Sequence, residues 1–258
     1  MRIGLVIEYE GTDFLGSQLQ SRGRTVQGEL ERALEALFQT ATRARMASRT
    51  DTGVHARGQV AAFDFETRLS MTTIRDALNH YLPGDIGVRH AARVADSFDP
   101  RRHAIRREYV YTINDSQVPS PIDRRFEAHV RGPLDVEAMA GAARGLEGTH
   151  DFAAFCGGAL PVDASTVRRM DQATVCRDDR HVRITFLANA YLNQQVRRMA
   201  GALMQVGAAM MSPERFAAFV SKPVRGDARV VAQPHGLCLT RIEYRGGTPS
   251  GLPALNEA

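Results

Sequence analysis

The residues best suited to chemistry gather in one polar stretch, Ser48 to Ala56, which reads Ser-Arg-Thr-Asp-Thr-Gly-Val-His-Ala. Asp51 lies at its centre, two residues after Arg49 and two before Gly53. A carboxylate kept ionised by a nearby cation can act as a nucleophile or stabilise a developing positive charge. An aspartate before a glycine also caps turns by accepting backbone N–H groups. The stretch alone leaves both a catalytic and a turn-capping Asp51 open.

Several other chemistries lack their motifs. The sequence has no lysine-ended phosphate loop, dinucleotide fingerprint, His-Glu-x-x-His motif or Gly-x-Ser-x-Gly elbow. Its eight histidines show no metal-ligand spacing, and Cys156, Cys176 and Cys238 are too few and too far apart for a zinc site or a disulfide framework. We therefore expect no metal site and a reducing cytoplasm. No signal segment opens the chain and no apolar run reaches a membrane span, so we expect no membrane association.

Arginine supplies nearly all of the positive charge. The chain has 258 residues, 43% of them apolar, which suffices for one large domain or two ordinary ones. Its formal net charge is +4, and Lys222 is the only lysine among 33 cationic side chains. The guanidinium fork binds phosphate and stacks on bases, which suits RNA. A genome that favours arginine codons would explain the count equally well, so the positions of the arginines must decide.

Apolar periodicity predicts the elements that position the polar stretch. A period of two predicts strands, and a period near 3.6 after a capping residue predicts helices. In the first half these patterns predict a strand over 3–9, a helix over 26–38 capped by Thr25, a strand over 59–66, and a helix over 71–81 capped by Ser70 and ended by Pro83-Gly84.

The second half shows the same alternation. The expected elements are a strand over 108–113, a helix over 135–145, a hairpin of 172–176 with 181–188, a helix through 196–204, a short helix after Ser212 and a strand over 237–244. We predict an α+β fold of two similar α/β halves, 1–104 and 105–247, with mainly antiparallel sheets flanking a central basic cleft. The tail, 248–258, is rich in Gly, Pro and Ser and is expected to be disordered.

Ordered blocks over residues 9–239 identify a family. The blocks are Tyr9-Glu10-Gly11-Thr12-Asp13-Phe14-Leu15-Gly16, Thr25-Val26-Gln27 with Leu30-Glu31, Arg49-Thr50-Asp51-x-Gly53-Val54-His55-Ala56, Phe98-x-x-Arg101-x-x-Ala104-x-x-Arg107-x-Tyr109-x-Tyr111, His150-Asp151-Phe152, Val196-Arg197-x-Met199-x-Gly201-x-Leu203 and Pro234-His235-Gly236-Leu237-x-Leu239. In these blocks the chain resembles the tRNA pseudouridine synthase A family. The resemblance implies the pseudouridine synthase fold and isomerisation of uridine without a cofactor.

The resemblance also assigns the chemistry. The aspartate that matches Asp51 is the family's essential carboxylate, in a reaction that breaks the N1–C1′ bond, turns the uracil and rejoins it through C5. A carboxylate near C1′ can stabilise or trap the positive ribose. Whether Asp51 attacks the ribose, attacks the base or removes a proton stays open.

Two further residues match the family's active site. Tyr109 matches a tyrosine that stacks on the uracil and can help to remove the C5 proton. Arg197 matches the arginine that pairs with the catalytic acid, here Asp51. Without the resemblance, Tyr109 is better interpreted as a core aromatic that alternates with Tyr111 and Ile113. Arg197 is then better interpreted as part of a solvated helix face, which is the role we expect for Arg198.

The remaining implications concern tRNA. Arg49 resembles the arginine expected near a flipped target nucleotide. Further candidates for phosphate contact are Arg22, Arg24, Arg101, Arg102, Arg106 and Arg107. The family modifies uridines at tRNA positions 38, 39 and 40, in the anticodon stem-loop, and acts as a homodimer. The chain departs from the family pattern at four places. Ser17 replaces the usual tryptophan, Ser48 replaces glycine, and Thr52 replaces alanine. Asn193-Gln194-Gln195 stands where a more apolar or His-Met sequence is usual. These departures put RNA positioning in doubt more than the chemistry.

Two rival functions stay open. A tRNA-binding chaperone without catalysis would bind the anticodon arm and leave uridine unchanged. An N-glycosidase shares the electrophilic C1′ but would liberate free uracil. Product analysis separates the three hypotheses.

Overall fold

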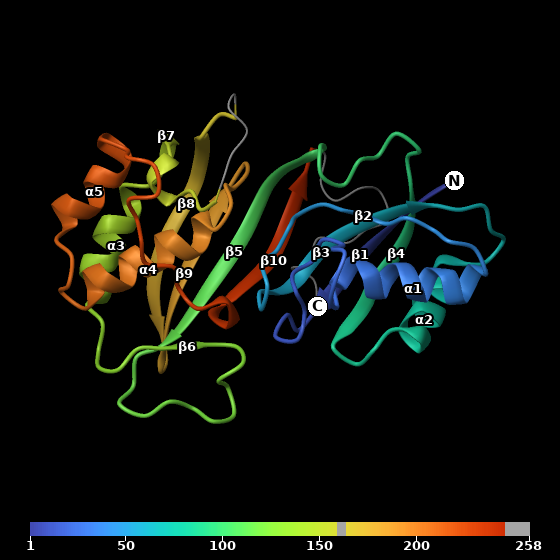
Figure 1. Ribbon diagram of the computed structural model, residues 1–258, viewed down its shortest axis with the longest axis horizontal. Helices are drawn as coiled ribbons and strands as arrows, with labels where there is room; N and C mark the ends of the chain where they lie inside the picture. Colours follow the sequence, from blue (N-terminus) through green and yellow to red (C-terminus); the bar gives the residue numbers. More distant parts are fainter. Residues whose placement is uncertain (159–163, 246–258) are drawn as a thin grey trace. The chain divides into compact units, whose positions relative to one another are not determined.

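The computed structural model describes residues 1–158 and 164–245. Within these ranges the chain forms five α-helices and ten β-strands, an α+β fold with mixed sheet pairing. It divides into two compact units (Figure 1). Among the described residues, the first unit comprises Met1–Arg107 together with residues 238–245, and the second comprises those of Glu108–Leu237.

The first unit is built on strand β1 (Arg2–Tyr9), which lies between β3 (His55–Asp64) and β4 (Ile86–Val94) and is antiparallel to both. The short β2 (Arg45–Met46) pairs antiparallel with β3. On the other side of β3 lies β10 (Leu237–Tyr244), which runs parallel to it. The sheet is therefore mainly antiparallel, as the sequence predicts, with one parallel neighbour.

Two helices pack on this unit, side by side (Figure 1). Helix α1 (Val26–Phe38) begins where the Thr25 hydroxyl accepts the Gly28 N–H at 3.2 Å. Helix α2 (Met71–Tyr81) begins where Ser70 accepts the Thr73 N–H at 3.0 Å. Both helices have the bounds and caps expected from the sequence, because apolar spacing and a side-chain cap agree at each start.

The second unit has the strand order β5-β9-β8-β7, formed by β5 (Ala104–Asn114), β9 (His181–Ala188), β8 (Val167–Asp178) and β7 (Gly148–Asp151). Strands β8 and β9 form the expected antiparallel hairpin, and β7 is antiparallel to β8. A two-residue strand, β6 (Ala128–His129), runs parallel to the end of β5.

The helices of the second unit gather together (Figure 1): α3 (Val136–Arg144), α4 (Gln195–Gly207) and α5 (Pro213–Ser221). Between them lies an aromatic core of Phe155, Phe216 and Phe219, whose ring centroids are 5.3 to 6.2 Å apart. Phe155 belongs to a short 3₁₀ helix, η1 (Ala153–Phe155), and all three phenylalanines are buried. This core anchors α4, which carries Arg197.

Several sequence expectations differ from the structure, and strands β2, β6 and β7 are among the elements that the sequence patterns do not predict. The sequence patterns did not predict β4, because Arg89 and His90 interrupt the alternation of apolar residues in this strand. The pairing of β4 with β1 shifts register at the same place. Residues 238–245 fall with the first unit rather than with the expected second half, because Cys238 and Leu239 pair with His55 and Ala56 of β3. The predicted tail, 248–258, lies outside the described residues.

None of the helices in residues 1–158 and 164–245 has the length and apolarity needed to cross a membrane.

Candidate active site

Asp51 lies in the loop between β2 and β3 and is half-buried. The residue before it, Thr50, is held by two hydrogen bonds to Ser17, which comes from the loop between β1 and α1. The Thr50 N–H donates to the Ser17 hydroxyl at 2.9 Å, and the Ser17 N–H donates to the Thr50 carbonyl at 3.1 Å. Ser17 is completely buried. We call this reciprocal contact the Ser17–Thr50 clamp.

Glycine is required beside the clamp. Gly16 has φ +86°, and a Cβ there would lie 2.9 Å from the Thr50 carbonyl oxygen. A side chain at this position would strain the backbone and push the loop that carries Asp51 away. The glycine therefore permits the loop from β1 to lie directly against the loop that carries Asp51.

Buried polar side chains of β1 and β3 make further hydrogen bonds to the residues around the clamp. The Thr50 hydroxyl lies 2.8 Å from the Tyr9 hydroxyl, at the end of β1. Gln59, which is fully buried on β3, accepts the Ser48 N–H at 3.1 Å and donates to the Ser48 carbonyl at 2.8 Å. Because buried hydrogen bonds fix geometry when all their partners are present, this network holds the main chain before Asp51 in one conformation.

The main chain itself closes the turn after Asp51. The Val54 N–H donates to the Asp51 carbonyl at 3.1 Å, and Gly53, with φ +78°, donates its N–H to the Phe14 carbonyl at 3.3 Å. Nearby, the Gly11 N–H donates to His55 Nδ1 at 2.9 Å. These bonds hold the turn through backbone groups and a histidine ring.

The arginines predicted to meet RNA fall into two groups. Arg49, Arg22, Arg101 and Arg102 are exposed. Arg24 instead forms a bidentate ion pair with Asp85, at 2.5 and 2.7 Å. It also bonds Glu29 at 2.7 Å and lies over the Phe14 ring, 4.3 Å from its centroid.

The ion pair has electrostatic consequences and a structural one. The hydrogen bond from Arg24 holds the pKa of the Asp85 carboxyl below its usual range, and Asp85 in turn raises the pKa of Arg24. These contacts tie the β1–α1 loop to the residue before β4.

Two other predicted arginines also make contacts within the fold. Arg107 is buried and donates to the carbonyls of Ala104 at 3.1 Å and Arg101 at 2.8 Å. Arg106 pairs with Glu243 at 3.3 Å. Their contacts give both residues a structural role, and RNA contact by them stays a prediction.

In the second unit, Tyr109 and Tyr111 lie on the buried face of β5. The Tyr109 ring meets the Tyr191 ring edge to face, with centroids 5.3 Å apart. The Tyr111 hydroxyl donates to the Gln233 carbonyl at 3.0 Å, and burial raises its pKa above the usual range. Tyr109 is thus a packed aromatic in this structure, and its catalytic role stays a prediction.

Arg197 lies in the first turn of α4. Its Nε donates to the Ala232 carbonyl at 2.8 Å, and the Ala232 N–H donates back to the Arg197 carbonyl at 3.0 Å. Burial lowers the pKa of His235, and the charge of Arg197 lowers it further. The structure therefore brings Arg197 close to the Pro234-His235-Gly236 block within the second unit.

The neighbouring Arg198 corrects an expectation. It is half-buried, and its guanidinium donates to the Ala228 carbonyl at 2.6 Å and to the Gln194 side chain at 3.2 Å. The predicted solvated role is wrong, because the segment after α5 folds over the start of α4 and supplies carbonyl acceptors.

The histidine block forms a short 3₁₀ helix, η2 (Pro234–Gly236), packed against β5. A Cβ at Gly236 would lie 2.9 Å from the Thr112 carbonyl oxygen and 2.9 Å from the Tyr111 ring. Only glycine allows this close approach.

Sequence reasoning missed two residues that hold the Asp51 loop, Ser17 and Gln59, and gave no role to His235, whose pKa is lowered by burial and further by the charge of Arg197. Ser17 was noted only as a departure from the family pattern, although a serine in a glycine-bounded loop is a common acceptor for backbone N–H groups. Gln59 could have been found from the sequence, because a polar residue among the apolar residues of a predicted strand often makes buried hydrogen bonds. His235 stood in a family block but had no assigned role.

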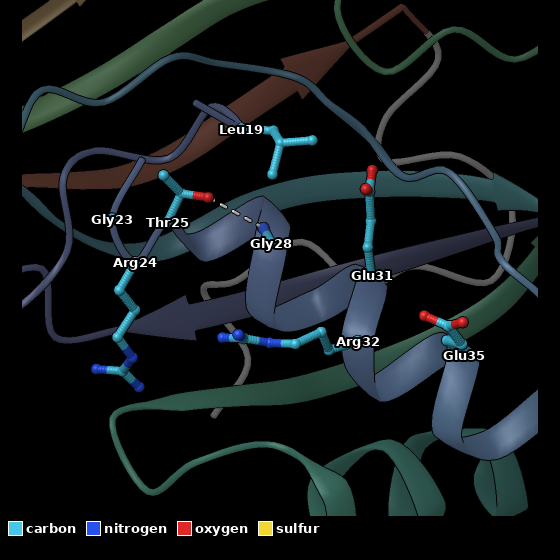
Figure 2. Close-up of a pocket in the computed structure, with 8 residues that line it drawn as sticks. All are labelled: Leu19, Gly23, Arg24, Thr25, Gly28, Glu31, Arg32 and Glu35. Carbon is cyan, nitrogen blue, oxygen red and sulfur yellow. Dashed lines mark hydrogen bonds between the residues drawn. The ribbon is translucent and has the colours of Figure 1, made fainter. Parts of the chain in front are cut away.

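A shallow hollow of about 290 Å³ lies at the start of α1 (Figure 2). Its lining is Leu19, Gly23, Arg24, Thr25, Gly28, Glu31, Arg32 and Glu35. Arg24 is the only predicted site residue among them. Within the described parts of the chain, no three His, Cys, Asp or Glu side chains are grouped so that they could hold a metal ion.

Comparison with known proteins gives the class of this fold and site. A family model described as tRNA pseudouridine synthase matches residues 5–101 and 142–245. The chain therefore belongs to the tRNA pseudouridine synthase family. It is 45% identical over 246 residues to "tRNA pseudouridine synthase A" of Roseiflexus sp. (strain RS-1), covering 94% of this chain and 90% of that protein. It is 40% identical over 242 residues to the protein of the same name from Pelobacter propionicus, covering 94% and 99%.

Proposed function

We propose that this protein isomerises uridine to pseudouridine in the anticodon stem-loop of tRNA, at positions 38, 39 and 40, with Asp51 as its catalytic carboxylate. The observation that carries the proposal is the loop of residues 48–56, where the family's catalytic block coincides with a main chain fixed by buried hydrogen bonds. Relatives of nearly the same length carry the name tRNA pseudouridine synthase A. Catalytic groups need such preorganised support.

The reaction balances without another reactant. The N1–C1′ bond breaks, uracil leaves with the electron pair, and positive charge develops at ribose C1′. Asp51 stabilises or traps this charge. The uracil turns, C5 forms the new bond to C1′, and the proton from C5 leaves for a base while N1 gains one. Attack on ribose, attack on the base and proton removal are all compatible with a carboxylate at this place.

Tyr109 and Arg197 complete the proposed site. We assign Tyr109 to stacking on the uracil and to assisting removal of the C5 proton. In the proposed site Arg197 is the cation that pairs with Asp51, which is the pairing that the family match implies. The support for both roles is the family match, together with the location of Arg197 at the start of a helix whose next turns are buried.

The substrate accounts for the exposed arginines. A uridine in a stem must leave the base stack before C1′ can be reached, and Arg49 is exposed in the same loop as Asp51. Arg22 and Arg101 supply further charge for phosphates, and Arg24 and Arg107 shape the segments that present them. We propose that the protein acts as a homodimer in the cytoplasm.

Release of tritium tests the assignment. With tRNA labelled at uracil C5, the wild-type protein releases label, and Asp51→Ala and the isosteric Asp51→Asn release none. Because the main chain closes the turn, both variants should keep the wild-type melting temperature within a few degrees. Full activity in either variant would falsify the assignment.

Product analysis then separates the rivals. Digestion of the RNA to nucleosides yields pseudouridine for a synthase, free uracil for an N-glycosidase and unchanged uridine for a chaperone. The positions modified are read by comparing transcripts in which U38, U39 and U40 are replaced one at a time.

A further inference from the structure

An exposed loop in the second unit combines apolar and cationic side chains. It connects β5 to β6 over residues 115–127, and in Figure 1 it is the green loop beside the β6 label. Val118 is 74% exposed, Ile122 is 85% exposed and Phe126 is 54% exposed. Large apolar side chains gathered on a surface mark a site of interaction.

The loop is held in one conformation by its own polar groups. The Ser120 hydroxyl donates to Asp123 at 2.9 Å and accepts the Asp123 N–H at 3.1 Å. The Phe126 N–H donates to the Asp123 carbonyl at 2.7 Å, and Arg180 of the β8–β9 turn pairs with Asp123. The exposed apolar side chains therefore stand on a braced segment, which lowers the entropy lost on binding.

The C-terminal end of the loop is fixed at Glu127, which is 3% exposed. One of its carboxylate oxygens accepts from Asn114 Nδ2 at 2.7 Å, and the other lies 2.7 Å from His181 Nε2. At the other end of the loop, Asp115 forms a bidentate pair with Arg177, at 2.7 and 2.9 Å.

The charge of the loop follows from these contacts. All three of its carboxylates, on residues 115, 123 and 127, turn to partners within the second unit. Three arginines are exposed: Arg124 and Arg125 in the loop, and Arg131 just after β6. The outer surface thus combines positive charge with an exposed aromatic ring, which is the combination that binds phosphates and unstacked bases.

We propose that the β5–β6 loop is a second RNA-contact surface, on which Arg124 and Arg131 bind tRNA phosphates and Phe126 packs on a nucleobase. The identity of the RNA as tRNA rests on the proposed function. The charge of the loop favours a polyanion over a second copy of this chain, since the carboxylates of the same loop are already engaged. The surface adds affinity and takes no part in the chemistry.

The salt dependence of binding tests the proposal. We compare wild-type protein with Arg124→Ala/Arg131→Ala, measuring Kd for an unmodified tRNA transcript from 50 to 300 mM KCl. Loss of two phosphate contacts should weaken binding about tenfold at low salt and reduce the slope of log Kd against log salt by roughly 1 to 2. The matched control, Arg144→Ala/Lys222→Ala, removes two exposed cations elsewhere on the second unit and should leave the slope unchanged.

A second variant isolates stacking. Phe126→Ala should weaken tRNA binding roughly fivefold or more with an unchanged salt slope. Phe126→Tyr keeps the ring and should restore affinity. Both variants should release tritium with the wild-type kcat at saturating tRNA.

The outcomes are distinct. Wild-type affinity and slope in Arg124→Ala/Arg131→Ala would overturn the inference while leaving the proposed function intact, whereas absence of tRNA binding by the wild-type protein would overturn both. Light scattering gives the oligomeric state of each variant. A halved mass for Ile122→Asp, with unchanged tRNA affinity, would assign the loop to a contact between copies and overturn the RNA role.

Discussion

The Ser17–Thr50 clamp predicts a catalytic defect at a residue that does not touch the substrate. Ser17→Ala removes the acceptor of the Thr50 N–H and leaves the Ser17 N–H bond to the Thr50 carbonyl in place. Thr50 is 6% exposed and Ser17 is fully buried, so water does not replace the lost hydroxyl.

The size of the effect follows from that burial. An unsatisfied buried donor costs about 1–3 kcal/mol of folding free energy. For a chain of this length, that cost lowers Tm by roughly 2–12 °C. The neighbouring Asp51 then loses part of its support. Since a displacement of about 1 Å can cost a hundredfold in rate, we expect kcat to fall about tenfold to a hundredfold. KM should change little, because no RNA-contacting group is altered.

Steady-state tritium release from C5-labelled tRNA measures kcat and KM separately. The matched control is Ser21→Ala, which makes the same substitution at an exposed position of the same loop and should leave both constants and Tm unchanged. Ser17→Cys keeps a weak acceptor of similar size and should give an intermediate kcat.

A normal kcat in Ser17→Ala, together with a lowered Tm, would refute the reasoning. That result would mean that the clamp stabilises the fold while Asp51 keeps its position without it.

Two further predictions concern the second unit. Gly236→Ala places a Cβ against the Thr112 carbonyl and should cost about 1–3 kcal/mol of unfolding free energy in denaturant titration, whereas Gly84→Ala, with no atom within 4 Å, should cost much less. Arg197→Gln removes the cation that lowers the His235 pKa, so NMR titration should show that pKa rising. Because burial depresses the folded His235 pKa, its contribution to stability is present above pH about 6.5 and is lost as pH falls through the folded value. An unchanged His235 pKa in Arg197→Gln would contradict the proximity of the two groups.

The helices could be predicted from the sequence because two independent signals agree at their starts. Thr25 and Ser70 each cap a segment with a regular apolar stripe, and the observed bounds are the predicted ones. Strand β4 could not be predicted in the same way. Its middle carries Arg89 and His90, and its existence depends on pairing with β1, which sequence periodicity does not report.

The start of strand β3, which lies within the block that contains Asp51, also could not be predicted from sequence periodicity. Its predicted start was residue 59, whereas the strand begins at His55, because Ala56 pairs with Tyr9 of β1 and His55 with Cys238 of β10. The motif containing Asp51 was visible in the sequence. The buried partners that hold it are set by tertiary contacts between segments about 30 to 50 residues apart, as with Ser17 and Thr50.

The parallel pairing of β10 with β3 also constrains the order of synthesis. The strand that follows the catalytic loop acquires this neighbour only when Cys238 and Leu239 have been made, roughly 180 residues after His55 and Ala56. At about 5–20 residues per second, a ribosome needs roughly 9–36 s to synthesise the residues between them. A nascent chain therefore carries Asp51 long before the sheet beside it is complete. Products truncated before β10 should lack this neighbour of β3, so the sheet beside the Asp51 loop is complete only after residues 237–244 have been synthesised.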